Sequence, residues 1–151
     1  MAKQSPKYIP PSSDEFLEKF INYIMRRGKK SIARRSFNNA LTIIKGRGYK
    51  DPVATFLRAV SNVSPLLAIK AKRIGGAVYQ VPIEVSPSRQ KMFAFTWILN
   101  AARDKKGAQF AKKLADEIIE AAEGAGTAVK KKEDTLRMAQ ANKAFAHFAR
   151  Y

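Results

Sequence analysis

Residues 67–85 read LAIKAKRIGGAVYQVPIEV and interrupt a chain whose other segments follow a helical pattern. Apolar and polar residues alternate with a period of two on both sides of Gly75 and Gly76, which is typical of a β-hairpin. A two-residue Gly-Gly turn would pair Ile69 with Pro82 and place the two apolar sets on opposite faces, so we expect an odd-numbered loop. Because Pro82 has no N–H to donate to a ladder, its strand is expected at an edge of a two-stranded ribbon.

Three helices are expected before the hairpin. Residues 12–15 resemble a capping box that starts the first helix, and Gly28 ends it. A second helix is expected over about residues 31–45. Asp51 and Pro52 supply an N-cap and a first-turn proline for the third. The apolar residues at helical spacing are expected in the core: Phe16, Phe20, Ile21, Ile24, Ala33, Phe37, Ala40, Leu41, Ile44, Val53, Phe56, Leu57 and Val60.

Three more helices are expected after the hairpin. The fourth follows Ser86-Pro87, is apolar nearly all round and is expected at the centre of the fold. The fifth covers about residues 109–123, and its outer face is the only acidic one. The last is expected to start near Glu133 and to run to the C-terminus. Apolar residues expected inside are Met92, Phe95, Ile98, Leu99, Ala102, Phe110, Leu114, Ala115, Ile118, Ala122, Met138, Ala141, Phe145 and Phe148.

The sequence therefore predicts a mainly α fold: about six helices in one domain, residues 14–151, with a protruding two-stranded antiparallel β-hairpin at about residues 67–85. Residues 1–13 are expected to form an irregular basic N-terminal arm that carries Lys3 and Lys7. A frayed terminus is the alternative for this arm.

The chain has a large excess of positive charge. It contains 29 Lys and Arg against 12 Asp and Glu, a net charge of +17, and its pI is about 10.3. This balance indicates a partner of dense negative charge. No stretch reaches the roughly 18 uninterrupted apolar residues of a spanning helix, and residues 1–6 lack the apolar core of a signal peptide. We therefore expect a soluble protein that is not exported and binds no membrane. The absence of Cys excludes disulfides and thiolate metal sites.

The cations gather in three clusters. The first lies at the joint between the first two helices, where no acid occurs from Arg26 to Arg35. The second lies on and just after the hairpin, whose tip glycines permit close approach of the backbone to a partner. The third is a lysine run expected to precede the last helix. The alternatives are an ordinary solvated turn for the first cluster, a lysine-guarded edge strand for the second and a non-specific charge run for the third.

Catalysis is not expected, and neither is a cofactor. His147 is the only histidine, so no constellation that needs a second imidazole can be assembled. Asp116, Glu120 and Glu123 share one helical face and offer a metal site as an alternative to a solvated surface. Because most aromatic residues lie in apolar stripes, we expect contacts to the phosphates of a folded RNA rather than stacking on a single strand.

Three blocks of sequence resemble a known family. They read FINYIMRRGKKS at residues 20–31, RIGGAVYQVPIEV at 73–85 and KKKEDTLRMAQANKAFAHF at 130–148. They are similar to small-subunit ribosomal protein seven of bacterial and organellar type, along nearly the whole chain from about Lys7. The resemblance implies a structural constituent of the small ribosomal subunit, located in ribosomes of a bacterial cytoplasm or an organelle. It implies binding to the 3′ major domain of 16S-type rRNA, nucleation of head assembly, and a place beside exit-site tRNA and the emerging mRNA.

The same resemblance implies neighbours and site residues. The neighbours are the ninth and eleventh small-subunit proteins. Together with the charge clusters, it assigns rRNA binding to Lys3, Lys7, Arg26, Arg27, Lys29, Lys30, Arg34, Arg35, Lys70, Lys72, Arg73, Gly75, Gly76, Arg89 and Lys91. It places near tRNA or mRNA the residues Tyr79, Lys130, Lys131, Lys132, Arg137, Lys143 and Arg150.

The chain departs from the family pattern at four positions. Thr96 replaces a usual arginine, Leu136 a common histidine and Ala68 a common glutamate, and Ala149 is inserted before the end. Two other functions remain open on the residues alone. An architectural DNA-binding protein would use basic β-arms with an apolar wedge at the tip, for which only Ile74 is available. A nuclease is the third reading.

Overall fold

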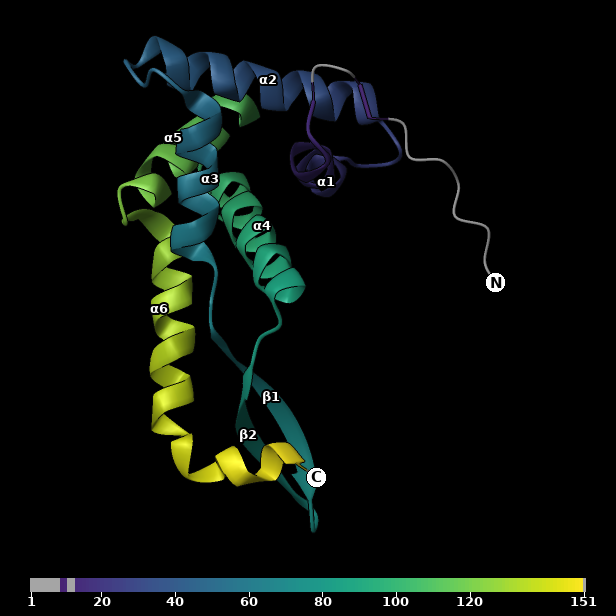
Figure 1. Ribbon diagram of the computed structural model, residues 1–151, viewed down its shortest axis with the longest axis vertical. Helices are drawn as coiled ribbons and strands as arrows, with labels where there is room; N and C mark the ends of the chain where they lie inside the picture. Colours follow the sequence, from purple (N-terminus) through teal and green to yellow (C-terminus); the bar gives the residue numbers. More distant parts are fainter. Residues whose placement is uncertain (1–8, 11–12, 151) are drawn as a thin grey trace.

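The computed structural model describes residues 9–10 and 13–150. In this part of the chain the fold is mainly helical, with one two-stranded antiparallel sheet, as the sequence predicts. The elements are α1 (Glu15–Ile24), α2 (Lys30–Gly46), α3 (Pro52–Val63), β1 (Leu67–Ile74), β2 (Ala77–Glu84), α4 (Pro87–Asp104), α5 (Phe110–Ala122), α6 (Gly126–Ala141) and the 3₁₀ helix η1 (Lys143–Arg150). Helices α1 to α5 gather at one end, and the hairpin and α6 extend from them to the other end, where η1 crosses the hairpin (Figure 1).

Aromatic side chains from four helices meet in the core. The ring of Phe20 lies 5.3 Å from Phe37, 4.7 Å from Phe56 and 5.1 Å from Phe95, and all four side chains are buried. Edge-to-face and tilted contacts of this kind add to the stabilisation that burial provides. Helix α4 crosses this cluster and buries Ile98 completely, so the prediction that it lies centrally is confirmed.

Some apolar residues assigned to the core are exposed instead. Leu57 is 45% exposed, Met92 39% and Met138 47%. Helical periodicity alone therefore placed too wide a face of these helices in the core.

The prediction of an odd-numbered hairpin loop is wrong. Ile74 pairs with Ala77 across a two-residue turn, and Ile69 pairs with Pro82. Gly75 and Gly76 both have positive φ, 57° and 88°, as the favoured two-residue hairpin turns require. The apolar side chains of β1 therefore lie on the opposite face of the hairpin from those of β2. This arrangement is possible because other elements pack on the hairpin. Helices α6 and η1 pack against it, and a single shared face is not needed.

The last helix also differs from the prediction. Helix α6 starts at Gly126, seven residues before Glu133, and it ends at Ala141, after which the chain continues as the 3₁₀ helix η1. Glu117 of α5 accepts a hydrogen bond from the Ala128 N–H at 2.9 Å and so satisfies one backbone donor at the start of α6. The capping residue comes from another helix, which a local sequence signal does not reveal. At the first helix, the N-cap Asp14 makes no side-chain capping bond, contrary to the expected capping box.

Candidate nucleic-acid interface

The corner between α1 and α2 carries the densest group of cations. We call Arg26, Arg27, Lys29, Lys30, Arg34 and Arg35 the corner cations. Arg27 and Gly28 have positive φ, 53° and 72°, a left-handed conformation that is uncommon for an arginine. Arg26, Arg27, Lys29 and Arg35 are exposed. Among the described residues, no acid forms an ion pair with any of these four, so their charges are available to an anionic partner.

The other two corner cations contact a buried acid of α1. Arg34 Nη2 donates to Glu18 Oε2 at 2.8 Å, and Lys30 Nζ lies 3.2 Å from the same oxygen. Glu18 is 4% exposed. Burial raises the pKa of this carboxyl, but hydrogen bonds from Arg34, Ser13 and Lys30 outweigh it and lower the pKa below the ordinary value. Glu18 is therefore ionised at neutral pH and ties the first turns of α2 to α1.

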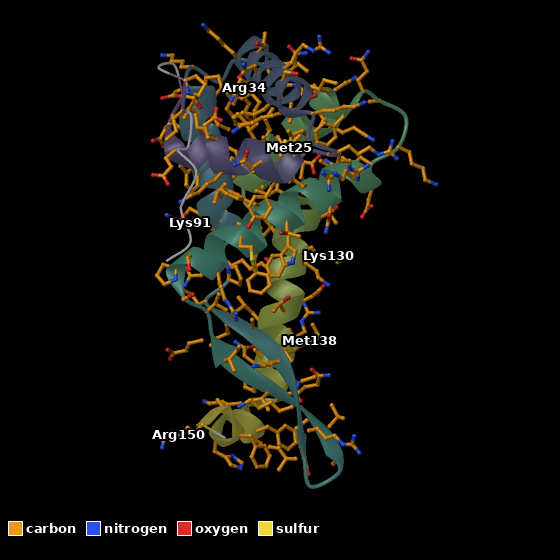
Figure 2. All side chains as sticks on the ribbon, turned by 90° about the vertical axis from the view of Figure 1, so that its right-hand side faces the viewer. Met25, Arg34, Lys91, Lys130, Met138 and Arg150 are labelled. Carbon is orange, nitrogen blue, oxygen red and sulfur yellow. The ribbon has the colours of Figure 1, made fainter. Side chains whose placement is uncertain are left out.

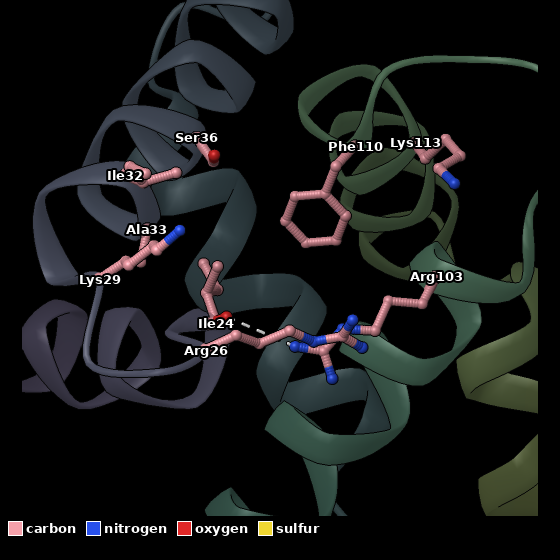
Figure 3. A pocket seen from close by; sticks show the side chains of 9 residues that line it. All are labelled: Ile24, Arg26, Lys29, Ile32, Ala33, Ser36, Arg103, Phe110 and Lys113. Atoms are coloured by element: carbon pink, nitrogen blue, oxygen red, sulfur yellow. Dashed lines mark hydrogen bonds between the residues drawn. The ribbon is translucent and has the colours of Figure 1, made fainter.

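A basic pocket of about 470 Å³ opens beside this corner. Figure 3 shows the guanidinium groups of Arg26 and Arg103 close together at its edge, with Phe110 facing α2 across the hollow. Arg103 donates to the Ile24 carbonyl at 3.4 Å, and burial followed by the charge of Arg26 lowers its pKa. Lys113 donates to the carbonyl of Lys105 at 2.8 Å. Four cations and no acid line the pocket: Arg26, Lys29, Arg103 and Lys113.

Sequence reasoning did not select Arg103 or Lys113. The two residues lie 68 or more positions after the last corner cation in the chain, on α4 and α5, and only the packing of these helices against α1 and α2 brings them to the corner. The one available signal is that Arg103 interrupts the largely apolar end of a buried helix without a nearby acid that faces it.

The cations of the second predicted cluster, on and just after the hairpin, do not lie together in the structure. Lys70 and Arg73 are exposed on β1, and Arg73 lies beside the tip glycines Gly75 and Gly76. Lys72 Nζ instead donates to the carbonyls of Phe148 and Ala149 at 3.0 and 3.1 Å, so its charge holds the end of η1. Arg89 and Lys91 lie in the first turns of α4, at the opposite end of the hairpin. The ammonium of Lys91 is 5.3 Å from the centre of the Phe16 ring.

The third group is spread along α6 and η1. Lys130 and Lys131 are exposed within α6, rather than before it, whereas Lys132 Nζ donates to the Asn62 carbonyl at 2.8 Å. Arg137 pairs weakly with Asp134 at 3.5 Å. Figure 2 shows Arg34 at one end of the molecule, Lys91 and Lys130 further along, and Arg150 at the far end. The predicted clusters therefore do not form one continuous site.

Tyr79 and the η1 segment form an aromatic cluster at this far end. The Tyr79 ring lies 5.3 Å from Phe145 and 5.1 Å from Phe148. His147, which is exposed, lies 4.1 Å from Phe148. Lys143 lines a hollow of about 650 Å³ between the hairpin and the α6–η1 segment.

The acidic face of α5 is paired within the chain. Asp116 contacts Arg47, Glu120 contacts Lys105 at 2.9 Å, and the Tyr49 hydroxyl donates to Glu123. Glu123 raises the pKa of that hydroxyl, chiefly by accepting its hydrogen bond. Within residues 9–10 and 13–150, no three His, Asp or Glu side chains group in a way that could hold a metal ion. The same residues contain no helix of the length and apolarity needed to cross a membrane.

Five residues singled out from the sequence lie in the N-terminal arm or depart from the family pattern. Lys3 and Lys7 lie outside the described residues. The Thr96 hydroxyl donates to the Met92 carbonyl at 2.9 Å, and Ala68 is buried, at 8% exposed. The inserted Ala149 supplies one of the carbonyls that Lys72 contacts.

These features define a class: a small, strongly basic, mainly helical protein that presents unpaired cations and a β-ribbon to a polyanionic partner. The chain belongs to a family within this class, the one described as ribosomal protein S7p/S5e, whose sequence profile matches residues 2–143. The resemblance seen in the sequence is thereby confirmed. The chain is accordingly a ribosomal protein, and the expectation that it is not an enzyme is confirmed by this membership.

Bacterial relatives cover nearly the whole chain. The small ribosomal subunit protein uS7 of Thermomicrobium roseum is 48% identical over 150 residues, 95% of this chain and 96% of its own length. The protein of the same name from Thermotoga maritima is 50% identical and covers 94% of both chains. That of Pseudomonas aeruginosa strain LESB58 is 46% identical over 97% of this chain and 94% of its own.

Proposed function

We propose that this chain is a structural constituent of the small ribosomal subunit that binds the 3′ major domain of 16S-type rRNA directly. The relatives' name, small ribosomal subunit protein uS7, supports the subunit. The observation that carries RNA binding is the corner, where the basic pocket adjoins the exposed Arg26, Arg27, Lys29 and Arg35, none of which pairs with an acid in the described part of the chain. Lys and Arg side chains in this arrangement release counterions when they bind a phosphate backbone, which drives association.

The corner is proposed as the main contact because its cations converge. Arg26 and Lys29 line the pocket together with Arg103, so one RNA backbone at the pocket would reach all three (Figure 3). The exposed cations at the hairpin tip and at the start of α4 would contact other parts of the rRNA. Phosphate contacts at several separated points favour a folded RNA over an extended strand, because they fix its shape as well as its charge.

The finer parts of the proposal follow from the family resemblance. The protein would bind early and nucleate assembly of the subunit head. Its far end, where Tyr79 packs on the η1 rings of Phe145 and Phe148 and where Lys143 and Arg150 are exposed, would lie toward exit-site tRNA and mRNA. The ninth and eleventh small-subunit proteins would be its neighbours, in ribosomes of a bacterial cytoplasm or an organelle. Residues 14–151 would act as one rRNA-binding domain, with residues 1–13 as an additional basic arm.

The test compares the affinities of the full-length protein for different domains of the rRNA and for duplex DNA. Filter binding would measure the Kd for transcripts of the 3′ major domain, the 5′ domain and a duplex DNA of equal length, at about 100 mM salt. The proposal predicts that the 3′ major domain binds at least about a thousandfold more tightly than duplex DNA, the lower end of ordinary specificity ratios. Equal affinity for all three would contradict it and would favour an architectural nucleic-acid-binding protein.

A further inference from the structure

Glu18 is the one acid that contacts corner cations within the described residues. Its side chain is 5% exposed, and its two oxygens accept hydrogen bonds from Arg34 at 2.8 and 3.4 Å. Lys30 adds an ion pair at 3.2 Å. Because Glu18 lies in α1 and both cations lie in the first turns of α2, the carboxylate bridges the two helices across the corner.

Two features of the corner would destabilise its conformation without this bridge. Arg27 holds a left-handed conformation that costs an arginine free energy. Like charges crowd on a short stretch of backbone, and Arg26 lies close enough to Arg103 to lower its pKa. An anchored carboxylate opposes both effects, since it holds two of the cations in place and offsets part of their mutual repulsion.

We infer that Glu18 is a positioning residue for RNA binding, whose buried carboxylate fixes the start of α2 so that Arg26, Arg27 and Lys29 face one RNA backbone. The inference rests on the proposed function, because a corner that binds no RNA has nothing to position. Glu18 itself touches no RNA. It acts through the geometry of residues 26–30.

This role predicts an effect opposite in sign to that of charge alone. Removing an acid raises the net charge of the protein, which by itself strengthens binding to a polyanion. Loss of positioning weakens binding instead. Glu15 offers a matched control, because it lies on the same helix and, among the residues that the structure describes, pairs only with Lys19, at 3.3 Å, with both side chains more than half exposed.

The experiment compares Glu18→Gln with Glu15→Gln in the full chain. The Kd for a transcript of the 3′ major domain would be measured between about 50 and 200 mM salt, at a temperature where circular dichroism shows both variants folded. We expect Glu18→Gln to bind about tenfold more weakly at 100 mM salt, with a salt slope smaller by about one, which corresponds to one lost phosphate contact. Glu15→Gln should bind as tightly as the unchanged chain or more tightly.

Several outcomes would overturn the inference. If Glu18→Gln binds as tightly as Glu15→Gln, the carboxylate does not position the corner, and if it binds more tightly, Glu18 masks the cations. A lower melting temperature with unchanged Kd would leave Glu18 a purely structural role. If Glu18→Gln does not fold, Glu18→Asp keeps the charge, shortens its reach and should still weaken binding. Failure of the unchanged chain to bind the transcript would instead refute the proposed function.

Discussion

Glu117 is a fully buried carboxylate at the junction of α4, α5 and α6. One oxygen caps the Ala128 N–H, and the other lies 3.0 Å from Lys105 Nζ without good hydrogen-bond geometry. Glu117→Ala would leave a backbone donor and an ammonium without this partner, so we expect a loss of about 3 kcal/mol in the free energy of unfolding. Urea denaturation would measure it. Glu120→Ala removes the more exposed partner of Lys105 and should lower the free energy of unfolding by less than about 1 kcal/mol. Equal losses in the two variants would show that Glu117 does not stabilise the junction more than an exposed ion pair does.

Gly126 tests the close packing at the same junction. A Cβ there would lie 3.0 Å from Glu120 atoms and 3.1 Å from Glu117 Oε1, in a backbone with a φ of +89°. At Gly124 the φ is +79°, but a Cβ would meet nothing within 4 Å. Alanine at either position pays the left-handed penalty of about 1 kcal/mol, and only Gly126→Ala adds a steric cost. Thermal unfolding should therefore give Gly126→Ala a lower melting temperature than Gly124→Ala. The reverse order would contradict the close approach of Glu117 and Glu120 to position 126.

Glu18 also makes stability depend on acid pH. Because its pKa is lower in the folded state than in the unfolded chain, its ionised form stabilises the fold above the ordinary value of 4.5. This contribution is lost as the pH falls through the folded pKa. Urea denaturation at a series of pH values from 7 downward should show a smaller loss below pH 4.5 in Glu18→Gln than in the unchanged chain. If the free energy of unfolding falls equally with pH in both proteins, the Glu18 carboxyl does not contribute to this pH dependence.

At the scale of elements, η1 depends on the hairpin and not on the main core. Its Phe145 and Phe148 rings pack on Tyr79, and none of the three belongs to the buried cluster formed by α1 to α6. Tyr79→Ala should therefore speed proteolysis within residues 143–150 by about tenfold or more, since this segment opens locally. The melting temperature of the main transition should change little. Val78→Ala, at a 64% exposed position of the same strand, is the control, and equal protection in both variants would contradict the coupling.

Local patterns predicted most elements but not those that depend on distant partners. Asp51 caps α3 by accepting from the Ala54 N–H, as expected for an N-cap before a proline. The hairpin register and the start of α6 were predicted wrongly. In both cases a distant segment decides the outcome: η1 covers the second apolar set of the hairpin, and Glu117 caps α6 from another helix. The spacing of apolar residues in the sequence does not indicate which distant segment will pack on them.

At the scale of the whole molecule, the sequence showed where the cations gather along the chain but not which groups each cation contacts in the fold. The corner was visible because its cations lie close together in the chain, within residues 26–35. Arg103 and Lys113 joined it only through packing. Lys72 and Lys132, chosen for their neighbours in sequence, hold carbonyls of η1 and α3. An excess of charge therefore identifies the kind of partner, whereas the tertiary contacts decide which cations are free to meet it.

The most direct test of the account is the salt dependence of RNA binding by two triple variants that lose equal charge. The first replaces Arg26, Arg27 and Lys29 with Ala at the corner, and the second replaces the exposed Lys45, Lys50 and Arg58 near the opposite end of α2. The Kd for the 3′ major domain transcript would be measured across a range of salt concentrations. The corner variant should lower the slope of log Kd against log salt by about two to three, and the other variant by less than about one. Equal slopes in the two variants would contradict the claim that the corner binds the RNA backbone.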